Sequence, residues 1–333
     1  MSRAVVVGYG NVGRLLARML ADAGWETAAW DRCAEPEAAG AGRPGAVAGA
    51  EGRPVPRPRS ADVTAPTAGQ RAELARADVV FLAVPEQAAL AALDVLESAL
   101  APHATVVETL SHKHRFLDAA DRRLAPRALL SLNPLFHPSL GWADNAVTAS
   151  VLRPDARCAQ VLRLISATGA RVVRLSHEEH DRHVTAVQAA THAALLAFTG
   201  ALARLGVRAP TVADCAPPPT RALLALAARV LSADVETYWD IQAAGGEATA
   251  ARDAVAAALA DLSERTTAPT GGEKAFRQLF EEVADWFGEG RATAADDAAR
   301  MLQALIATGP PSPVGTAPPS HDTHTAHPPR RPS

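Results

Sequence analysis

A glycine-rich turn near the N-terminus constrains the fold of this chain more than any other feature. The β-branched apolar run Ala4–Val7 precedes Gly8-Tyr9-Gly10-Asn11-Val12-Gly13, and a helix-prone segment follows at once. The three glycines allow a tight turn, a close approach of the backbone to a pyrophosphate, and close packing of the helix against the strand. Free N–H groups at the start of that helix face an anion. The turn therefore predicts a Rossmann-type domain that binds a dinucleotide.

The second expected strand, Glu26–Trp30, ends at Asp31. A carboxylate about twenty residues past the glycines normally binds the hydroxyls of a ribose. Asp31 should repel a 2′-phosphate and so favours NAD over NADP, although Arg32 beside it could accept that phosphate. Besides the six turn residues, we expect Val84 and Pro85 to contact the cofactor, because the apolar strand that begins at Asp78 ends there. Another adenosyl ligand, such as S-adenosylmethionine, or no ligand at all, remains the alternative.

Composition excludes several classes of protein. The chain has 333 residues, enough for two domains, and its net charge of −3 comes without a basic stripe, which argues against a nucleic-acid partner. Its three cysteines, Cys33, Cys158 and Cys215, are too scattered for a disulfide framework or a zinc site, so a reducing cytoplasm is expected. We expect no signal peptide, because the first apolar strand is short and leads into the glycine turn, and no apolar run of membrane-spanning length is free of arginine, proline and glycine. We therefore expect no membrane partner.

Strands and helices alternate along the first half of the chain. Apolar strands at 78–84, 105–109, 127–132 and 146–152 follow the first two, with helices at 70–76, 86–100 and 155–168 among them. This pattern predicts an α/β fold with an N-terminal Rossmann-type, doubly wound, mostly parallel sheet covered by helices on both faces. After a strand at 171–175 only helical periodicity remains, beginning with a long helix from Glu178 to about Leu205. The second half is therefore expected to form an all-α domain.

The expected organisation has three regions: a Rossmann domain over 1–176, a helical domain over 177–308 and a disordered tail over 309–333. The tail is rich in Pro, Ser, Thr and His and has no apolar period, so it cannot bury a core. Residues 33–69 are rich in Pro, Gly and Ala. We expect them to form an irregular surface insertion, interrupted by a short strand near Ser60–Thr64.

Two clusters of histidines raise the question of a metal site. One opens the long helix at positions 177, 180 and 183, and the other lies in the tail at 321, 324 and 327. The helical spacing spreads the first three imidazoles around the axis, and no third ligand is evident for an ion between His180 and His183. The tail cluster has no carboxylate or cysteine to complete it. We therefore expect no metal site, and we assign Asp181 to the first helical turn, where a carboxylate complements the helix dipole.

Three segments carry reactive side chains in a specific order. They are Ser111-His112-Lys113, then His180-Asp181 with Gln188-Ala189-Ala190-Thr191-His192, then Arg229 upstream of Glu236–Ile241. With the glycine turn, Asp31 and Ala83-Val84-Pro85, they resemble the prephenate dehydrogenase family, which includes arogenate and 4-amino-4-deoxyprephenate dehydrogenases. The resemblance runs from the glycine turn to about residue 290.

This resemblance implies an NAD-dependent oxidoreductase of aromatic amino acid or specialised metabolite biosynthesis. Members transfer a hydride from a cyclohexadienyl carboxylate to the cofactor and release carbon dioxide, which aromatises the ring. The helical domain would bind the substrate and form most of a homodimer interface.

The same resemblance implies roles for individual residues. The catalytic residues would be Ser111, Asn133, His192 and His137, of which the first three orient the ring substituent. Arg229 would bind a substrate carboxylate, because a guanidinium fork suits that ligand. Gln188 lies one helical turn before His192 and shares its face. Lys113 either binds a carboxylate or is solvated, and His112 and His114 are expected at the loop surface.

The chain departs from the family pattern at the catalytic histidine. The family's His-Pro-Met-Phe-Gly-Pro is matched here by Asn133-Pro134-Leu135-Phe136-His137-Pro138. Asparagine can hydrogen-bond a substrate but cannot act as a base near neutral pH. His137 can replace the base only if its loop turns it inward. Thr191 also stands where many members carry an arginine for a substrate carboxylate.

These departures shape the expected substrate. A neutral amine needs no separate base before it pushes electrons out with the hydride, so 4-amino-4-deoxyprephenate is favoured, followed by prephenate or arogenate. A changed reaction in a specialised pathway also stays open. Two alternatives belong to other classes: a transferase that uses S-adenosylmethionine on the same scaffold, and a non-catalytic metabolite-binding protein.

Overall fold

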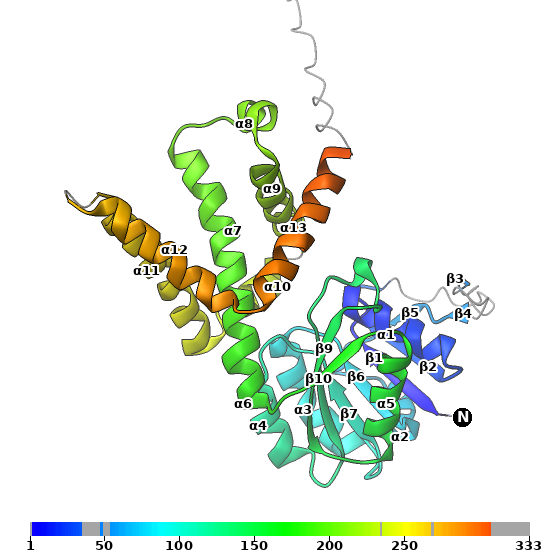
Figure 1. The fold of residues 1–333 in the computed structure, drawn as a ribbon. Coiled ribbons are helices and arrows are strands. Elements are labelled where there is room, and N and C mark those ends of the chain that lie inside the picture. The colour runs from blue at the N-terminus through cyan, green and yellow to red at the C-terminus, as the bar shows by residue number, and fades with distance from the viewer. Residues whose placement is uncertain (1, 35–46, 49–53, 234, 268–269, 308–333) are drawn as a thin grey trace, which may run out of the picture.

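A computed structural model gives the fold, and it describes residues 2–34, 47–48, 54–233, 235–267 and 270–307. The chain forms two lobes, a sheet with helices on both faces and a set of splayed helices beyond it (Figure 1). The expected tail at 309–333 lies outside the described residues, as do residues 35–46 and 49–53 of the expected insertion at 33–69. The short strand expected near Ser60–Thr64 lies slightly earlier, at Pro58–Ser60, where it pairs with the strand that ends at Asp31.

The sheet has eight strands in the order β10-β9-β8-β7-β6-β1-β2-β5. All neighbours are parallel except β8 and β9, so β9 and β10 run against the other six. A separate antiparallel pair joins β3 to β4. The strands are β1 (Arg3–Val7), β2 (Glu26–Asp31), β3 (Val47–Ala48), β4 (Pro54–Val55), β5 (Pro58–Ser60), β6 (Val79–Leu82), β7 (Thr105–Glu108), β8 (Leu129–Pro134), β9 (Ala146–Arg153) and β10 (Arg171–Arg174).

Helices cover both faces of this sheet and bury two apolar cores. One core packs helices α2 (Ala68–Arg76), α3 (Glu86–Ala99) and α4 (His114–Arg123) against the sheet, and the other packs α1 (Asn11–Asp22) and α5 (Ala156–Ala167) on the opposite face. All four residues of β6 and of β7 are buried, as expected of central parallel strands. The expected α/β fold with a Rossmann-type, mostly parallel sheet is therefore confirmed.

One long helical stretch leads from the sheet into the second lobe. It consists of α6 (His177–His180), a π-helical turn η2 (Asp181–Thr185) and α7 (Ala186–Arg204). By length and composition His177–Arg204 could cross a membrane, and 11% of its most apolar window is buried. The remaining helices are α8 (Ala209–Cys215), α9 (Pro218–Leu231), α10 (Val235–Gln242), α11 (Gly245–Thr267), α12 (Gly272–Phe287) and α13 (Gly290–Ala307).

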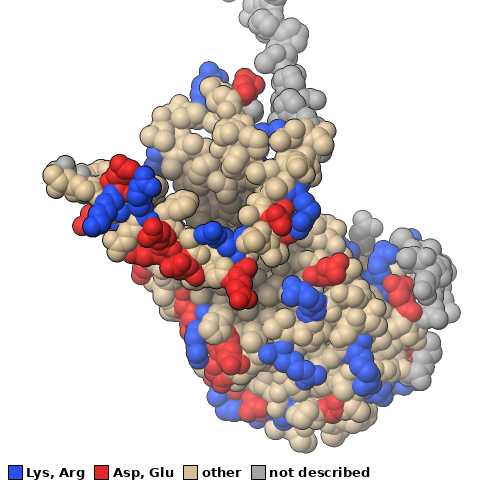
Figure 2. Space-filling model, viewed as in Figure 1, with Lys and Arg blue, Asp and Glu red and all other residues tan. Residues whose placement is uncertain are grey.

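The helices of the second lobe form two arms on α7. One arm is α11 with α12, and the other is α9 with α13 (Figure 1). Neither α12 nor α13 contains a buried residue. The hollow between the arms is lined mostly by uncharged side chains, with charged groups at its rims (Figure 2).

Two helices were not expected from the sequence. Helix α4 follows Lys113 directly, and α8 lies in a segment that carried no clear periodicity. Helix α4 is mostly polar and buries only Phe116, Leu117 and Ala120, so its apolar face is too narrow to stand out in the sequence. Its position matters for function, because its first residues contact the long helix.

Candidate active site

The glycine turn joins β1 to α1 at the carboxyl edge of the sheet. Gly8 has a φ of +88°, and a Cβ on it would lie 2.1 Å from the Ala83 carbonyl oxygen. A Cβ on Gly13 would lie 1.9 Å from the Gly8 carbonyl oxygen, whereas a Cβ on Gly10 would have no atom within 4 Å. Gly8 and Gly13 are therefore required by packing, and Gly10 faces open space at the start of a helix. That space is suited to an anion such as a pyrophosphate.

Asp31 lies at the end of β2, beside this turn. Its Oδ2 accepts a hydrogen bond of 2.7 Å from the backbone N–H of Tyr9, and its Oδ1 accepts one of 2.8 Å from Cys33. Each oxygen keeps a lone pair for a further donor, as ribose hydroxyls would provide. The Tyr9 hydroxyl donates to the Pro56 carbonyl at 2.5 Å, which links the turn to the segment after β4. Arg32 is exposed.

Asn133 lies at the carboxyl end of β8 and is buried against the long helix. Its Nδ2 lies 3.1 Å from His180 Nε2, and His180 Nδ1 lies 2.9 Å from Asp181 Oδ1. His180 is fully buried and Asp181 is 4% exposed. The three side chains thus form a chain of hydrogen bonds, Asp181–His180–Asn133, which we call the relay. Sequence reasoning did not assign His180 or Asp181 to the site.

Local sequence places the two helical members of the relay. Ser176 caps the helix and forms a capping box with Glu179: Glu179 N donates to Ser176 Oγ at 3.1 Å, and Ser176 N donates to Glu179 Oε2 at 2.9 Å. The box fixes where the helix starts, so His180 and Asp181 end its first turn. The π-helical turn then begins at Asp181. Single π turns often occur at functional sites because they change which side chains face inward.

Asp181 is anchored to the loop that follows β7. The backbone N–H of Lys113 donates to Oδ1 at 2.9 Å, and that of His114 donates to Oδ2 at 2.8 Å. His112 Nε2 lies 3.4 Å from Oδ2, so His112 contacts the relay rather than lying free at the loop surface. Burial raises the pKa of Asp181, but hydrogen bonds from His180 and the two backbone N–H groups, with the charge of His112, hold it below its ordinary value. Asp181 is therefore a carboxylate acceptor.

The protonation of the relay fixes the direction of the Asn133 amide. Burial lowers the pKa of His180, and Asp181 offsets this only in part, so His180 is neutral at pH 7. Its one ring proton lies on Nδ1, which faces the carboxylate, and Nε2 accepts from Asn133 Nδ2. A flipped amide would set two acceptors against each other. Asn133 Oδ1 then points away from His180 and accepts no hydrogen bond from the part of the chain that the structure describes, so it is an acceptor available to a ligand.

The Lys113 side chain is buried and paired inside the protein, whereas the sequence suggested a solvated side chain or one that binds a substrate carboxylate. Its side chain is 1% exposed, so it is not solvated, and Nζ lies 3.2 Å from Glu108 Oε1. Nζ also donates to the carbonyl oxygens of Leu110 and Leu132. Burial lowers the pKa of Lys113 and raises that of Glu108, and each is partly offset by the charge of the other. With these three partners the ammonium ties the loop after β7 to the end of β8, next to Asn133.

One face of the long helix carries polar atoms without partners. Thr185 Oγ1, Gln188 Oε1 and His192 Nδ1 are buried and make no hydrogen bond among the described residues. They follow one another at i, i+3 and i+7, which places them on one face. The His192 ring packs edge-on against Tyr238, with ring centroids 4.7 Å apart, and burial lowers its pKa. Buried polar atoms normally have partners, so this face has the character of a ligand wall. Thr185 was not singled out in the sequence.

The other candidate residues are spread around these groups. Ser111 is half-buried in the loop before Lys113. His137 Nδ1 lies 2.9 Å from Ser139 Oγ and caps the short turn Pro138–Leu140, so its ring serves its own loop rather than the relay. Arg229 is exposed in the last turn of α9, in the second lobe. Val84 and Pro85 lie between β6, which ends at Leu82, and the first residue of α3, Glu86.

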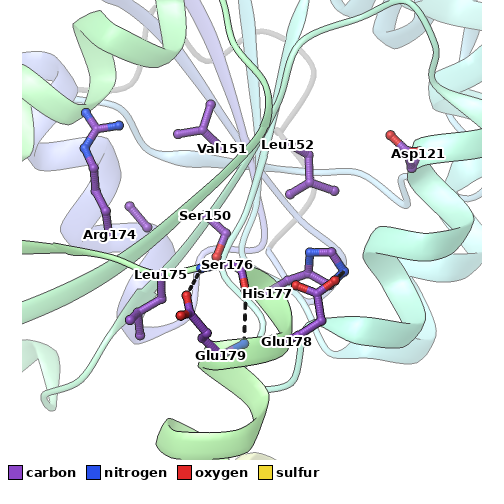
Figure 3. A pocket seen from close by; sticks show the side chains of 11 residues that line it. Asp121, Ser150, Val151, Leu152, Arg174, Leu175, Ser176, His177, Glu178 and Glu179 are labelled. Atoms are coloured by element: carbon purple, nitrogen blue, oxygen red, sulfur yellow. Dashed lines mark hydrogen bonds and ion pairs between the residues drawn. The ribbon is translucent and has the colours of Figure 1, made fainter.

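A separate pocket of about 690 Å³ lies beside the first turn of α6 (Figure 3). It is lined by β9 residues around Ser150, by Arg174 and by Ser176, His177 and Glu178. Its lining includes neither Asn133 nor the glycine turn, so it is distinct from the candidate active site.

The fold and these side chains define a Rossmann-type nucleotide-binding protein with a helical second lobe. Residues 4–117 match the family model described as ketopantoate reductase PanE/ApbA. The match covers the glycine turn and the strands β1, β2, β5, β6 and β7 of the eight-stranded sheet. The chain is 38% identical over 304 residues to a 4-amino-4-deoxyprephenate dehydrogenase of Streptomyces pristinaespiralis, which spans 91% of this chain and 97% of that protein.

Solved structures show the same fold. A prephenate dehydrogenase of A. aeolicus, in complex with hydroxyphenyl propionate and NAD+, aligns with a TM-score of 0.63 over 89% of this chain and 98% of that one, at 17% identity. A Synechocystis arogenate dehydrogenase aligns with a TM-score of 0.57 over 88% and 99%, also at 17% identity. The chain belongs to the prephenate dehydrogenase family, as the relative of 38% identity establishes.

Proposed function

We propose that this protein catalyses the NAD-dependent oxidative decarboxylation of 4-amino-4-deoxyprephenate. The observation that supports this substrate is the free acceptor Oδ1 of Asn133, held by the relay where the family has a catalytic histidine. The relative of 38% identity carries the name of this activity. Prephenate and arogenate bear a ring hydroxyl instead of an amine and are the next candidates.

An amine at the ring carbon suits an acceptor that is not a base. When the hydride leaves that carbon, the nitrogen lone pair forms a carbon–nitrogen double bond. Loss of carbon dioxide from the opposite ring carbon then returns the electron pair to nitrogen and leaves a neutral aromatic amine. Starting from the neutral amine, which has given its extra proton to solvent before it binds, no proton has to be removed in these steps. Asn133 Oδ1 would accept an N–H of the amine and hold its lone pair in line with the ring π system.

The other residues would position the substrate. Ser111 and His192 would contact the ring substituent from the loop after β7 and from α7, and Gln188 and Thr185 would extend the wall along the helix. Arg229 is the candidate for the side-chain carboxylate. Lys113 would act indirectly, because its ammonium is occupied by Glu108 and two carbonyl oxygens.

The glycine turn fits NAD as the cofactor. NAD, when bound, accepts the hydride on its nicotinamide. The open space at Gly10 would admit the pyrophosphate, and Asp31 would bind the ribose hydroxyls and disfavour a 2′-phosphate. We assign residues 1–176 to cofactor binding and 177–308 to substrate binding and dimerisation.

We also infer a cytoplasmic homodimer. The second lobe exposes large apolar side chains, among them Phe280 at 69% and Trp286 at 81%. Phe276, Phe280, Val283 and Phe287 recur on one face of α12, which has no buried residue. A second copy would cover this surface and the hollow of Figure 2. Cys33, Cys158 and Cys215 are all free thiols, which suits a reducing compartment.

The dimer is tested by sedimentation of the full chain. Phe280→Asp should lower the dimer fraction strongly, whereas the control Leu140→Asp, at a residue 60% exposed on the sheet lobe, should leave it unchanged. Equal sedimentation of all three proteins as monomers would refute the homodimer.

The activity is tested by direct turnover. The purified full chain, with NAD, is given 4-amino-4-deoxyprephenate, prephenate or arogenate, and NADH is followed by absorbance and the aromatic product by mass spectrometry. We expect kcat/KM for the amine to exceed the others by about tenfold or more, the value of one well-placed hydrogen bond. Asn133→Leu should abolish this preference while NAD still raises Tm. Absence of NADH with all three substrates, or a preference for prephenate, would overturn the proposal.

A further inference from the structure

A cluster of metal-binding side chains joins α4 to the start of α6, outside the proposed catalytic groups. His114 and Asp118 lie one turn apart on α4, and His177 is the first residue of α6. One ligand atom from each of the three lies within 4.8 Å of the other two. The three come from two helices far apart in the sequence, so the approach of His177 to the pair on α4 is a property of the fold.

A fourth side chain lies beside the cluster. Glu178 Oε1 lies 3.1 Å from His177 Nε2, and Figure 3 shows the two side chains next to each other. Glu178 is not one of the three residues whose ligand atoms lie within 4.8 Å of one another. The cluster itself therefore offers two nitrogen ligands and one oxygen ligand, and Glu178 is placed to turn toward a bound ion.

We propose that His114, Asp118 and His177 form a binding site for Zn²⁺, with Glu178 beside His177 as a further carboxylate that can reach the ion. Imidazole nitrogen and carboxylate oxygen are ligands that zinc takes, also in sites with three protein ligands and an open fourth position, whereas Mg²⁺ and Ca²⁺ prefer oxygen alone. Bonds of about 2.0–2.2 Å place tetrahedral ligand atoms about 3.5 Å apart. The side chains therefore close by about 1 Å from their metal-free separation, which rotamer changes at a surface allow.

Access and surroundings fit this ion. His177 and Glu178 also line the pocket of about 690 Å³, which opens the cluster to solvent. Without metal the side chains form two ion pairs, His114–Asp118 at 3.4 Å and His177–Glu178 at 3.1 Å. Exposed pairs of this kind contribute little to stability, so little free energy is lost when these side chains bind a shared cation instead.

Bound zinc would fix the junction of the two lobes. The His114 side chain would bind the zinc ion, while the His114 backbone N–H donates a hydrogen bond of 2.8 Å to Asp181 Oδ2. His177 begins the helix that continues into the second lobe. Zinc would thus hold α4 against α6 next to the relay, although it contacts neither Asn133 nor the glycine turn.

Zinc titration of the full chain tests the site. The starting protein carries alanine at His321, His324 and His327, which removes the adventitious ligands of the tail, and is freed of metal with a chelator. Isothermal titration with Zn²⁺ should show one equivalent, and Co²⁺ in its place should give the intense visible absorption of a tetrahedral complex. Affinity should fall as the pH is lowered, because imidazole ligands must be unprotonated.

Single substitutions locate the ion. His177→Gln and Asp118→Asn should each weaken Zn²⁺ binding by about tenfold or more, since even outer-shell substitutions cost that much. His103→Gln, at an exposed histidine before β7, is the control and should bind zinc unchanged. Circular dichroism checks that each variant is folded. No saturable binding in the starting protein, or equal affinity in the His177 and His103 variants, would overturn the proposal.

Discussion

Replacing Asp181 by asparagine should reverse the polarity of the relay. The carboxylate accepts from His180 Nδ1 at 2.9 Å and from the backbone N–H groups of Lys113 and His114. The Oδ2 position is reached by both backbone N–H groups, at 3.1 Å from Lys113 and 2.8 Å from His114. An asparagine that places its oxygen there keeps both donors and turns its amide NH₂ toward His180. His180 then accepts at Nδ1 and carries its proton on Nε2. Asn133 must flip to accept that proton, so its Nδ2 replaces Oδ1 at the substrate.

The size of the effect follows from the groups exchanged. A substrate amine would lose one hydrogen bond and meet a second donor in its place, which costs about 2–4 kcal/mol of transition-state binding. This corresponds to a loss of roughly 30- to 1,000-fold in kcat/KM. The variant also loses charge-assisted hydrogen bonds in a buried place, worth about 2–3 kcal/mol of stability. Its Tm should therefore fall by several degrees.

Steady-state kinetics with 4-amino-4-deoxyprephenate and NAD measure the loss, at a temperature where both proteins are folded by circular dichroism. Asp253→Asn is the matched control, because it removes the same charge from an exposed position on α11. The rise of Tm with NAD should be alike in all three proteins, since Asp31 and the glycine turn are untouched. A folded Asp181→Asn protein with kcat/KM within about threefold of the original would refute the polarity argument, because one lost hydrogen bond alone exceeds that.

Four further predictions concern single features. Gly10→Ala should fold with unchanged Tm but lose the rise of Tm that NAD causes. Gly13→Ala should be strongly destabilised, because its Cβ would lie 1.9 Å from the Gly8 carbonyl oxygen. Thermal melts with and without NAD distinguish the two variants. Lys113→Met leaves the Glu108 carboxylate buried and unpaired and should cost about 3–5 kcal/mol of unfolding free energy in denaturant titration. Thr185→Val should raise KM with little change in stability, while Thr185→Ser retains KM, if the unpartnered hydroxyl faces the substrate. Burial lowers the pKa of His180, so below a pH of about 6.5 the unfolded chain binds a proton at this histidine that the folded chain does not bind. The free energy of unfolding, measured by denaturant titration, should therefore fall as the pH drops below that value. The fall should be less steep in His180→Gln.

The sequence predicts the sheet well because its signals are local. The glycine turn, the apolar strands and the shift to helical periodicity after 175 each depend on neighbouring residues, and the structure has the corresponding strands and helices. Helix α4 was missed because only Phe116, Leu117 and Ala120 face the core. With no element predicted between the loop at 111–114 and the strand at 127–132, the two backbone donors that anchor Asp181 could not be placed.

The centre of the candidate site could not be predicted, because it depends on contacts between distant segments. Asn133 and His180 are 47 positions apart, and Glu108 pairs with Lys113 only because β7, its loop and β8 converge. Asp181 was explained by the helix dipole, a local reason that suffices for any acidic residue in a first turn. A usable signal was present in the sequence: the adjacent pair His180-Asp181, together with an asparagine at the place that the resemblance assigns to a family histidine.

The resemblance to the family sets Asn133 against a catalytic histidine, and the contact of Asn133 with the His180–Asp181 pair is consistent with one change of role. A buried carboxylate that accepts from a neutral imidazole increases the electron density on the far ring nitrogen. Paired with a histidine at 133, such a group would support proton removal from a hydroxyl. In this protein His180 Nε2 accepts instead from Asn133 Nδ2–H, at 3.1 Å. This hydrogen bond polarises the amide and makes Asn133 Oδ1 a stronger acceptor. A histidine at position 133 would act as a base toward a substrate hydroxyl, whereas Asn133 acts as a fixed acceptor that orients a substrate amine. One substitution at the end of the relay would therefore change the preferred substrate, and the rest of the site could stay the same.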